Sequence, residues 1–364
     1  MNLEKQKADI VCIDIEVARE LIHDILQKLN VPSDECSIVT EALLEASLSG
    51  YDSHGVMRIP MYFDAIRQGA MIPGAKIEVI NETSSSVHLD GGRGLGPVTA
   101  TYAMRLASKK ANETGVGCVS VVNSNDLARL GSYLLEPARK GLIALMMVND
   151  AGGGPSVAPW GGVEALLSTN PIAAGIPRRE DSPIIIDIST SVVSVGKLKM
   201  FANLGDKVPQ GWIVDKNGNY NTDPKTFFSD PKQGALLPLG GMLAGYKGFA
   251  LSLLIDILAG GLGGAGCSAG LKNENCGNGV FVLVIDPARF NSRENFTDCV
   301  EGFVDRVKNS KKAPGVEEIL IPGERAFRER QIRTKEGIPI DPPTWKRITE
   351  ILDELGIKNK RLTS

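Results

Sequence analysis

Residues 115–149, GVGCVSVVNSNDLARLGSYLLEPARKGLIALMMVN, combine two kinds of pattern that decide the fold class of the chain. The apolar runs at 115–122 and 141–149 predict two strands, and the residues between them, 129–140, carry a helical pattern. Strands that alternate with helices are typical of a layered α/β domain. We therefore expect an α/β fold around this stretch.

The alternation continues on both sides of this stretch. We expect further strands and helices in the middle of the chain, whereas the residues before about 70 and after about 291 indicate mainly helices. The sequence thus predicts an α/β domain at 75–299, inserted into a helical domain built from 1–74 and 300–364. The further expected strands are 76–81, 86–90, 172–176, 183–188 and 279–285, and the further expected helices are 97–113, 190–202 and 247–259.

Composition and charge exclude several classes of protein. The chain has 364 residues, with 40 basic and 43 acidic side chains and a net charge of −3, so a nucleic-acid partner is not expected. Its six cysteines form no Cys-x-x-Cys pair, and no His/Asp/Glu cluster has metal-ligand spacing, so we expect no metal. The charged N-terminus and an apolar stretch at 249–267 that includes Asp256 favour a cytoplasmic protein without a membrane span, with 247–259 as a buried helix.

One of the three histidines stands out as a candidate for chemistry. His23 and His88 fall in a helical and a strand pattern, which favours structural roles. His54 is followed by Arg58 and Tyr62, and a helical backbone would place all three on one face. Arg58 could bind a carboxylate with two hydrogen bonds, and His54 could exchange a proton with a substrate oxygen near neutral pH. A capping histidine beside a surface arginine is the alternative.

Two other segments could bind an anionic ligand. The expected strand 183–188 leads into three hydroxyl residues, 189–191, at the start of a helical pattern, where main-chain amides can bind phosphate. Lys247 lies between glycines at the start of the helix at 247–259. An N-cap without a ligand explains 189–191 equally well. Residues 261–266 fit G-x-G-x-x-G, but they follow a helical pattern and lead into a polar run, so a Rossmann site is not expected.

A series of short motifs runs in order from about residue 15 to 350. The motifs are DSHG at 52–55 with Arg58, LDGG at 89–92, NSN at 123–125 with Arg129, PSVAPWGG at 155–162, TNP at 169–171, DISTS at 187–191, LLPLGG at 236–241, YKG at 246–248 and PGE at 322–324. This ordered series resembles the malate/L-lactate dehydrogenase-like family of NAD(P)-dependent oxidoreductases. This family lacks a Rossmann fold and includes ureidoglycolate, sulfolactate, diketogulonate and cyclic-imine carboxylate enzymes.

The resemblance implies a homodimer that binds NAD or NADP in a cleft between a helical domain and the α/β domain. It also implies hydride transfer between the nicotinamide and a small molecule, with His54 as the proton donor and Arg58 as the carboxylate ligand. Ser53 and Tyr62 would contact the substrate. The implied cofactor contacts are Thr169, Asn170, Asp187, Ile188, Ser189, Thr190, Ser191, Tyr246, Lys247, Gly248, Pro322, Gly323 and Glu324.

The chain departs from the family at Asp126, where the family usually has a second histidine. Three interpretations follow. Asp126 could raise the pKa of His54 and keep it protonated, it could pair with a cationic group on the substrate, or the site could have lost most of its turnover.

The function that we expect is therefore an NAD(P)-dependent dehydrogenase acting on a small 2-oxo or 2-hydroxy acid. The alternatives are a reductase of a cyclic imino carboxylate, for which Asp126 would stabilise the iminium carbon, and a cofactor-binding protein with little turnover. The sequence leaves open the substrate, the choice between NADH and NADPH, and the direction of the reaction.

Overall fold

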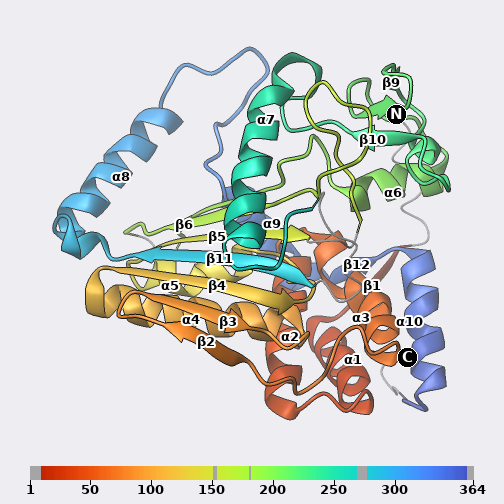
Figure 1. The fold of residues 1–364 in the computed structure, drawn as a ribbon, viewed down its shortest axis with the longest axis horizontal. Helices are drawn as coiled ribbons and strands as arrows, with labels where there is room; N and C mark the ends of the chain where they lie inside the picture. Colours follow the sequence, from red (N-terminus) through yellow and green to blue (C-terminus); the bar gives the residue numbers. More distant parts are fainter. Residues whose placement is uncertain (1–9, 151–153, 180–181, 269–276, 359–364) are drawn as a thin grey trace.

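A seven-stranded mixed sheet forms the centre of the molecule (Figure 1). The computed structural model describes residues 10–150, 154–179, 182–268 and 277–358. β3 and β4 are parallel, whereas the other neighbouring pairs in the sheet are antiparallel, so this is not the parallel sheet of a Rossmann domain. The strands, in order across the sheet, are β2 (Glu78–Glu82), β3 (Ser86–Asp90), β4 (Val116–Ser124), β11 (Asn278–Ile285), β5 (Ile143–Asp150), β6 (Ile172–Ile176) and β7 (Ile184–Ile188).

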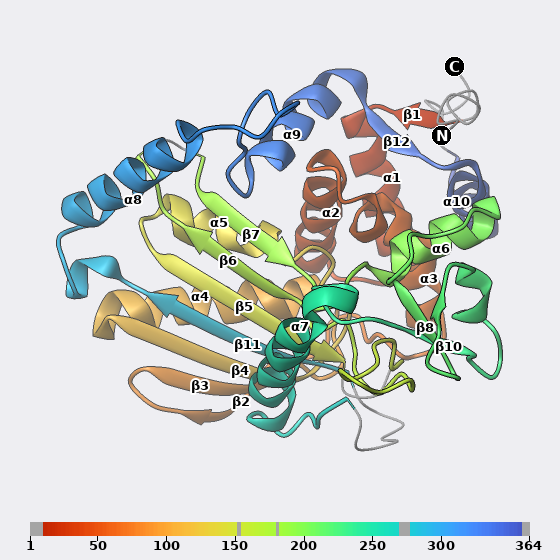
Figure 2. The same ribbon diagram turned by 90° about the horizontal axis from the view of Figure 1, so that it is seen from above.

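One face of the sheet is covered by α4 (Gly96–Thr114) and α5 (Gly131–Arg139) (Figure 2). Small side chains let α4 lie close to β4, because Ala103 and Ala107 have no exposed area. A Cβ atom on Gly117 would collide with the main-chain oxygen of Ala107. This close packing places the residues that follow β4 beside the N-terminal ends of both helices.

The opposite face of the sheet carries α7 (Gly241–Asp256), and α8 (Arg293–Lys308) lies near the strand ends on the same side (Figures 1 and 2). The expected buried helix at 247–259 is only half buried. Leu243 is 92% exposed, and Leu254, Ile257 and Leu262 are also exposed, because no other element among the described residues covers this side. With the π-helical turn η5 (Ile257–Gly261), α7 is long and apolar enough to cross a membrane, a property that core helices of soluble proteins share.

Both ends of the chain contribute to one helical core. This core packs α1 (Ile15–Lys28), α2 (Ser33–Leu48) and α3 (Ile59–Arg67) against α10 (Pro342–Glu354). β1 (Val11–Ile13) pairs with β12 (Ile338–Ile340), and α9 (Glu324–Glu336) packs on α2.

The polar stretch between β7 and α7 forms a small layer of its own. The sheet β10-β8-β9 (Gly234–Leu236, Ile213–Asp215, Tyr220–Asn221) covers a core with α6 (Val195–Leu204). α6 begins five residues later than the expected start at 190, because Ser194 is its N-cap and accepts a hydrogen bond from the amide of Lys197. The short turns are η2 (Asp52–His54), η3 (Val56–Arg58), η4 (Pro224–Thr226) and η6 (Pro287–Arg289).

The shared helical core predicts a large effect of a mutation near the C-terminus. Ile351 on α10 has no exposed area and packs in this core, so Ile351→Ala should lower the free energy of unfolding by about 2–4 kcal/mol. Urea denaturation would measure this change. Ile332→Ala on α9, where the side chain is 47% exposed, should change the value by less than about 0.5 kcal/mol. Equal effects of both substitutions would contradict the shared core.

Candidate active site

His54 lies at the end of a tight turn that α2 holds in place. Two short turns, η2 and η3, lead into α3, and Pro60 lies in the first turn of α3, where its missing N–H breaks no helical hydrogen bond. The backbone is therefore not one continuous helix from His54 to Tyr62, as the spacing suggested. Gly55 allows the close approach of α2, because a Cβ atom there would collide with Ser47, whose hydroxyl accepts a hydrogen bond from Val56.

Arg58 and Tyr62 converge on Asp126. The Nη1 atom of Arg58 lies 3.3 Å from Asp126 Oδ2, and the Tyr62 hydroxyl donates to Asp126 Oδ1 at 3.2 Å. The amide of Ala128 donates to the same Oδ1 atom at 3.1 Å. Burial and the Asp126 charge raise the pKa of Tyr62 well above its usual value, so the phenol remains a donor. Tyr62 is 1% exposed; its role as a substrate contact stays a prediction.

The surroundings of His54 favour the neutral form of its imidazole. Burial and the neighbouring charge of Arg58 lower its pKa from 6.5 to about 4, although Asp126 acts in the opposite direction. The effect of Asp126 on the pKa of the imidazole is smaller than each of these two, so the lowered pKa does not support the interpretation that Asp126 keeps His54 protonated. The Nδ1 atom of His54 shares a hydrogen bond of 2.9 Å with the Ser53 hydroxyl, which orients the ring.

Arg129 ties the candidate site to the sheet. It is buried, its Nη1 atom lies 3.0 Å from Glu45 on α2, and its Nε atom lies 3.6 Å from Asp187 on β7. Asp187 also accepts a hydrogen bond of 2.8 Å from the amide of Gly131. Burial raises the pKa of Asp187, against the opposing effects of Arg129 and this amide.

Sequence reasoning assigned no role to Glu45 or to Arg129. The signal that could have pointed to them was a carboxylate among the mainly apolar residues 42–48 and an arginine three residues after Asp126.

Several of the segments expected to bind a cofactor lie together. Thr190 donates from its amide and its hydroxyl to the main-chain oxygen of Thr169, at 2.9 and 3.0 Å. The side-chain amide of Asn170 donates to Ser252 on α7, and Ile185 on β7 donates to the main-chain oxygen of Pro322 at 3.1 Å.

The start of α6 reaches the His54 turn. A Cβ atom on Gly196 would lie 3.0 Å from the Cβ atom of Ser53. Among the described residues, no hydrogen bond links Tyr246, Lys247 or Glu324 to this turn. Tyr246 contacts Trp160 edge-on at 6.1 Å, and Glu324 binds Lys308 and the amide of Ile321.

These segments fit an anionic nucleotide cofactor. The Oδ1 atom of Asn170 is buried and has no hydrogen-bond partner in the protein, so it could accept from a group that the chain does not supply. Ser194 caps only the amide of Lys197, which leaves the first amides of α6 for an anion, and Gly196 brings no side chain to cover them.

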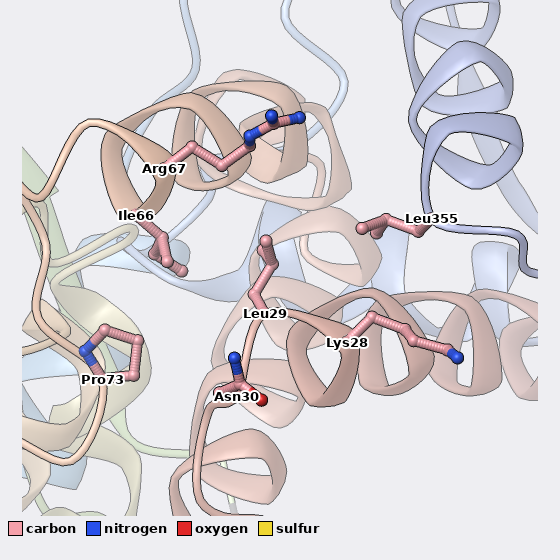
Figure 3. A pocket seen from close by; sticks show the side chains of 7 residues that line it. All are labelled: Lys28, Leu29, Asn30, Ile66, Arg67, Pro73 and Leu355. Carbon is pink, nitrogen blue, oxygen red and sulfur yellow. The ribbon is translucent and has the colours of Figure 1, made fainter.

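A separate hollow of about 530 Å³ lies at the C-terminal ends of α1, α3 and α10 (Figure 3). Arg67, one of the two charged residues that line it, already pairs with Glu354 at 3.1 Å. The hollow shares no residue with the cluster around His54. The lining residues are Lys28, Leu29, Asn30, Ile66, Arg67, Pro73 and Leu355.

An imidazole, a guanidinium and a carboxylate beside a nucleotide-compatible segment are the groups of an enzyme that acts on small molecules. A family model described as malate/L-lactate dehydrogenase matches residues 13–349. The malate dehydrogenase of Pyrococcus horikoshii is 40% identical over 340 residues, covering 92% of each chain. The chain therefore belongs to the malate/L-lactate dehydrogenase family, and it is an oxidoreductase.

Two further relatives agree with this assignment. The malate/(S)-sulfolactate dehydrogenase of Methanothermus fervidus is 37% identical, over 95% of this chain and 98% of that protein. The crystal structure of malate dehydrogenase from Entamoeba histolytica superposes with a TM-score of 0.91 at 30% identity, over 96% of this chain and 99% of that one.

The lowered pKa of His54 predicts a pH dependence of stability. In the unfolded chain His54 titrates near 6.5, and in the folded protein it titrates near 4. Between these values the unfolded state binds more protons, so the stability that His54 contributes above pH 6.5 is lost as the pH falls towards 4. Urea denaturation between pH 7 and 4.5 should show a smaller loss of stability for His54→Asn than for the wild type. His23→Asn is the matched control, and an unchanged slope for His54→Asn would contradict a neutral His54.

Proposed function

We propose that the chain is an NAD(P)-dependent dehydrogenase that transfers a hydride between the nicotinamide and a small 2-oxo or 2-hydroxy acid. The observation that carries this proposal is the neutral His54 beside Arg58, on a turn that meets the start of α6. The oxidation and its reverse require a cation that binds the substrate carboxylate and a neutral base that exchanges a proton with the substrate oxygen. The family to which the chain belongs supports the same reaction.

The roles of the two residues follow from their charges. Arg58 binds the substrate carboxylate and so fixes the neighbouring carbon, which replaces an encounter in solution by a held orientation. In the oxidation of a 2-hydroxy acid, neutral His54 accepts the hydroxyl proton. In the reduction, His54 donates a proton to the oxygen of the 2-oxo group. A substrate carboxylate on Arg58 offsets the positive charge that lowers the pKa of His54, so substrate binding favours the protonated imidazole.

The cofactor would bind along the segments that adjoin this turn, and it would supply the hydride. Residues 187–191, with Thr169 and Asn170, would hold it near His54, and the first amides of α6 would bind its phosphates. Residues 246–248 and 322–324 would complete the contacts. Both NAD and NADP are compatible with this proposal.

The finer architecture and the assembly belong to the same proposal. The α/β domain at 75–299 would be inserted between 1–74 and 300–364, whose helices share one core. A second copy of the chain would cover the exposed apolar side of α7, because contiguous apolar patches on a soluble protein usually mark an interface. The enzyme would thus be a cytoplasmic homodimer.

Reduction of a cyclic imino carboxylate is the second candidate function. It rests on Asp126, whose negative charge could stabilise an iminium group. Arg58, Tyr62 and Ala128 already bind this carboxylate, so it is less available to a cationic substrate.

Removal of the imidazole should abolish most of the activity. We expect His54→Ala to lower kcat by about 10²–10⁴-fold, because a positioned acid or base contributes a factor of this size. Steady-state oxidation of NADH or NADPH with a panel of 2-oxo acids would measure kcat, and fluorescence titration would show an unchanged Kd for the cofactor. His23→Ala is the control on α1. A His54→Ala enzyme with the turnover of the wild type would rule out the assignment.

A charge on the exposed side of α7 should separate the subunits. Leu254 is 49% exposed within one chain, so Leu254→Glu should convert a dimer into a monomer by placing a carboxylate in the interface. Sedimentation velocity would measure the mass. Tyr220→Glu on β9, where the side chain is 43% exposed, should remain a dimer. A monomeric wild type would contradict the proposed assembly.

A further inference from the structure

The Asp126 carboxylate is a fixed negative charge in the candidate site. Three donors hold it: Nη1 of Arg58 at 3.3 Å, the Tyr62 hydroxyl at 3.2 Å and the Ala128 amide at 3.1 Å. Its side chain is 25% exposed, so part of it faces the solvent. A substrate bound to Arg58 would therefore lie next to this carboxylate.

The loop that carries Asp126 leaves it little room to move. The side-chain amide of Asn125 donates to three main-chain oxygens, those of Ala70, Arg93 and Gly94, at 3.2, 2.8 and 3.2 Å. A Cβ atom on Gly96 would collide with the main-chain oxygen of Asp126, so the N-terminal end of α4 lies directly against the loop. These contacts hold the main chain of Asp126, and the carboxylate can turn away from an approaching anion only by losing its hydrogen bonds to Tyr62 and Ala128.

The six charged side chains joined in the ion pairs of Arg58 and Arg129 have formal charges that sum to zero. Arg58 pairs with Asp126, Arg129 pairs with Glu45 and Asp187, and Glu45 also pairs with Arg330. His54 itself is neutral, with a pKa of about 4. One substrate carboxylate on Arg58 brings this group of described residues to −1. Each cation of this cluster already has a carboxylate partner, so none is available for a second acidic group on the substrate. Asp126 would repel such a group.

We propose that Asp126 is a specificity-determining residue, which selects 2-oxo and 2-hydroxy acids with a single carboxylate and an uncharged remainder. This inference rests on the proposed function. The proposed selectivity for a single carboxylate would distinguish this chain from relatives named for malate and sulfolactate, which are both dianions at neutral pH. Discrimination arises because a like charge is placed against the competing ligand.

A pair of substrates that differ in charge but hardly in size tests this inference. Oxaloacetate carries two carboxylates, and its monoamide, 2-oxosuccinamate, carries one. We expect kcat/KM of the wild type to favour the monoamide by about tenfold or more, since two unit charges a few ångströms apart in a protein interact by at least this factor. Asp126→Asn should shift the ratio towards oxaloacetate by about tenfold. Both substrates use Arg58, so any change in that contact cancels in the ratio.

The control variant removes one negative charge elsewhere in the same region. Glu136→Gln on α5, where the carboxylate is exposed and pairs with Lys140, should leave the ratio unchanged. A wild type that prefers oxaloacetate, or shows no preference, would overturn the inference. So would a ratio that Asp126→Asn leaves unchanged.

A binding measurement separates failure of this inference from failure of the proposed function. Calorimetry with the enzyme and NADH or NADPH would compare oxamate, a monoanion, with tartronate, a dianion. Tighter binding of oxamate than of tartronate, with a preference that Asp126→Asn reduces, supports the inference. If no 2-oxo acid is turned over in that case, only the proposed function is overturned. Turnover of oxaloacetate and 2-oxosuccinamate at equal kcat/KM would overturn the inference alone. If the enzyme neither binds nor turns over any of these acids, the inference and the proposed function are both overturned.

Discussion

The buried ion network of Arg129 is the interaction on which the arrangement of the site depends. The guanidinium joins Glu45 on α2 to Asp187 on β7, and thus connects the helical core to the last strand of the large sheet. Its planar face also lies 4.3 Å from the centre of the Tyr51 ring, just before the His54 turn. A buried charge that loses its partner is strongly destabilising, so these three elements must keep their relative positions.

The same turn is held from the other side by α9. Arg333 binds the carboxylate of Asp52 and the main-chain oxygen of Ser47. α9 begins at Glu324, the last of residues 322–324, which we propose as cofactor contacts, so one helix connects these residues to the His54 turn. The charges that orient the turn are paired within the protein. Arg58, which pairs with Asp126, and the imidazole of His54 are the groups that we propose for contact with a substrate.

Local sequence patterns predicted the positions of strands and helices better than they predicted which sides of these elements are buried. The strands at 86–90 and 172–176 have the predicted bounds, because a short run of alternating or of continuous apolar residues is typical of a strand. The helix at 247–259 was expected to be buried, yet one side of α7 is exposed. An apolar sequence indicates that a helix packs against another surface, but it does not indicate whether the same chain provides that surface. The start of α6 was misplaced by five residues, because Ser189 and Ser194 are both plausible N-caps.

By itself, the sequence determined the α/β class, the family and the candidacy of His54 and Arg58, because these depend on residue types and spacing within short segments. Only the tertiary structure decided that Asp126 pairs with Arg58, 68 positions away, and that Arg129 links Glu45 to Asp187. The protonation of His54 also belongs to the tertiary structure. Its pKa depends on burial and on charges from distant segments, and the electrostatic energy of a group is set by distance in space rather than along the chain.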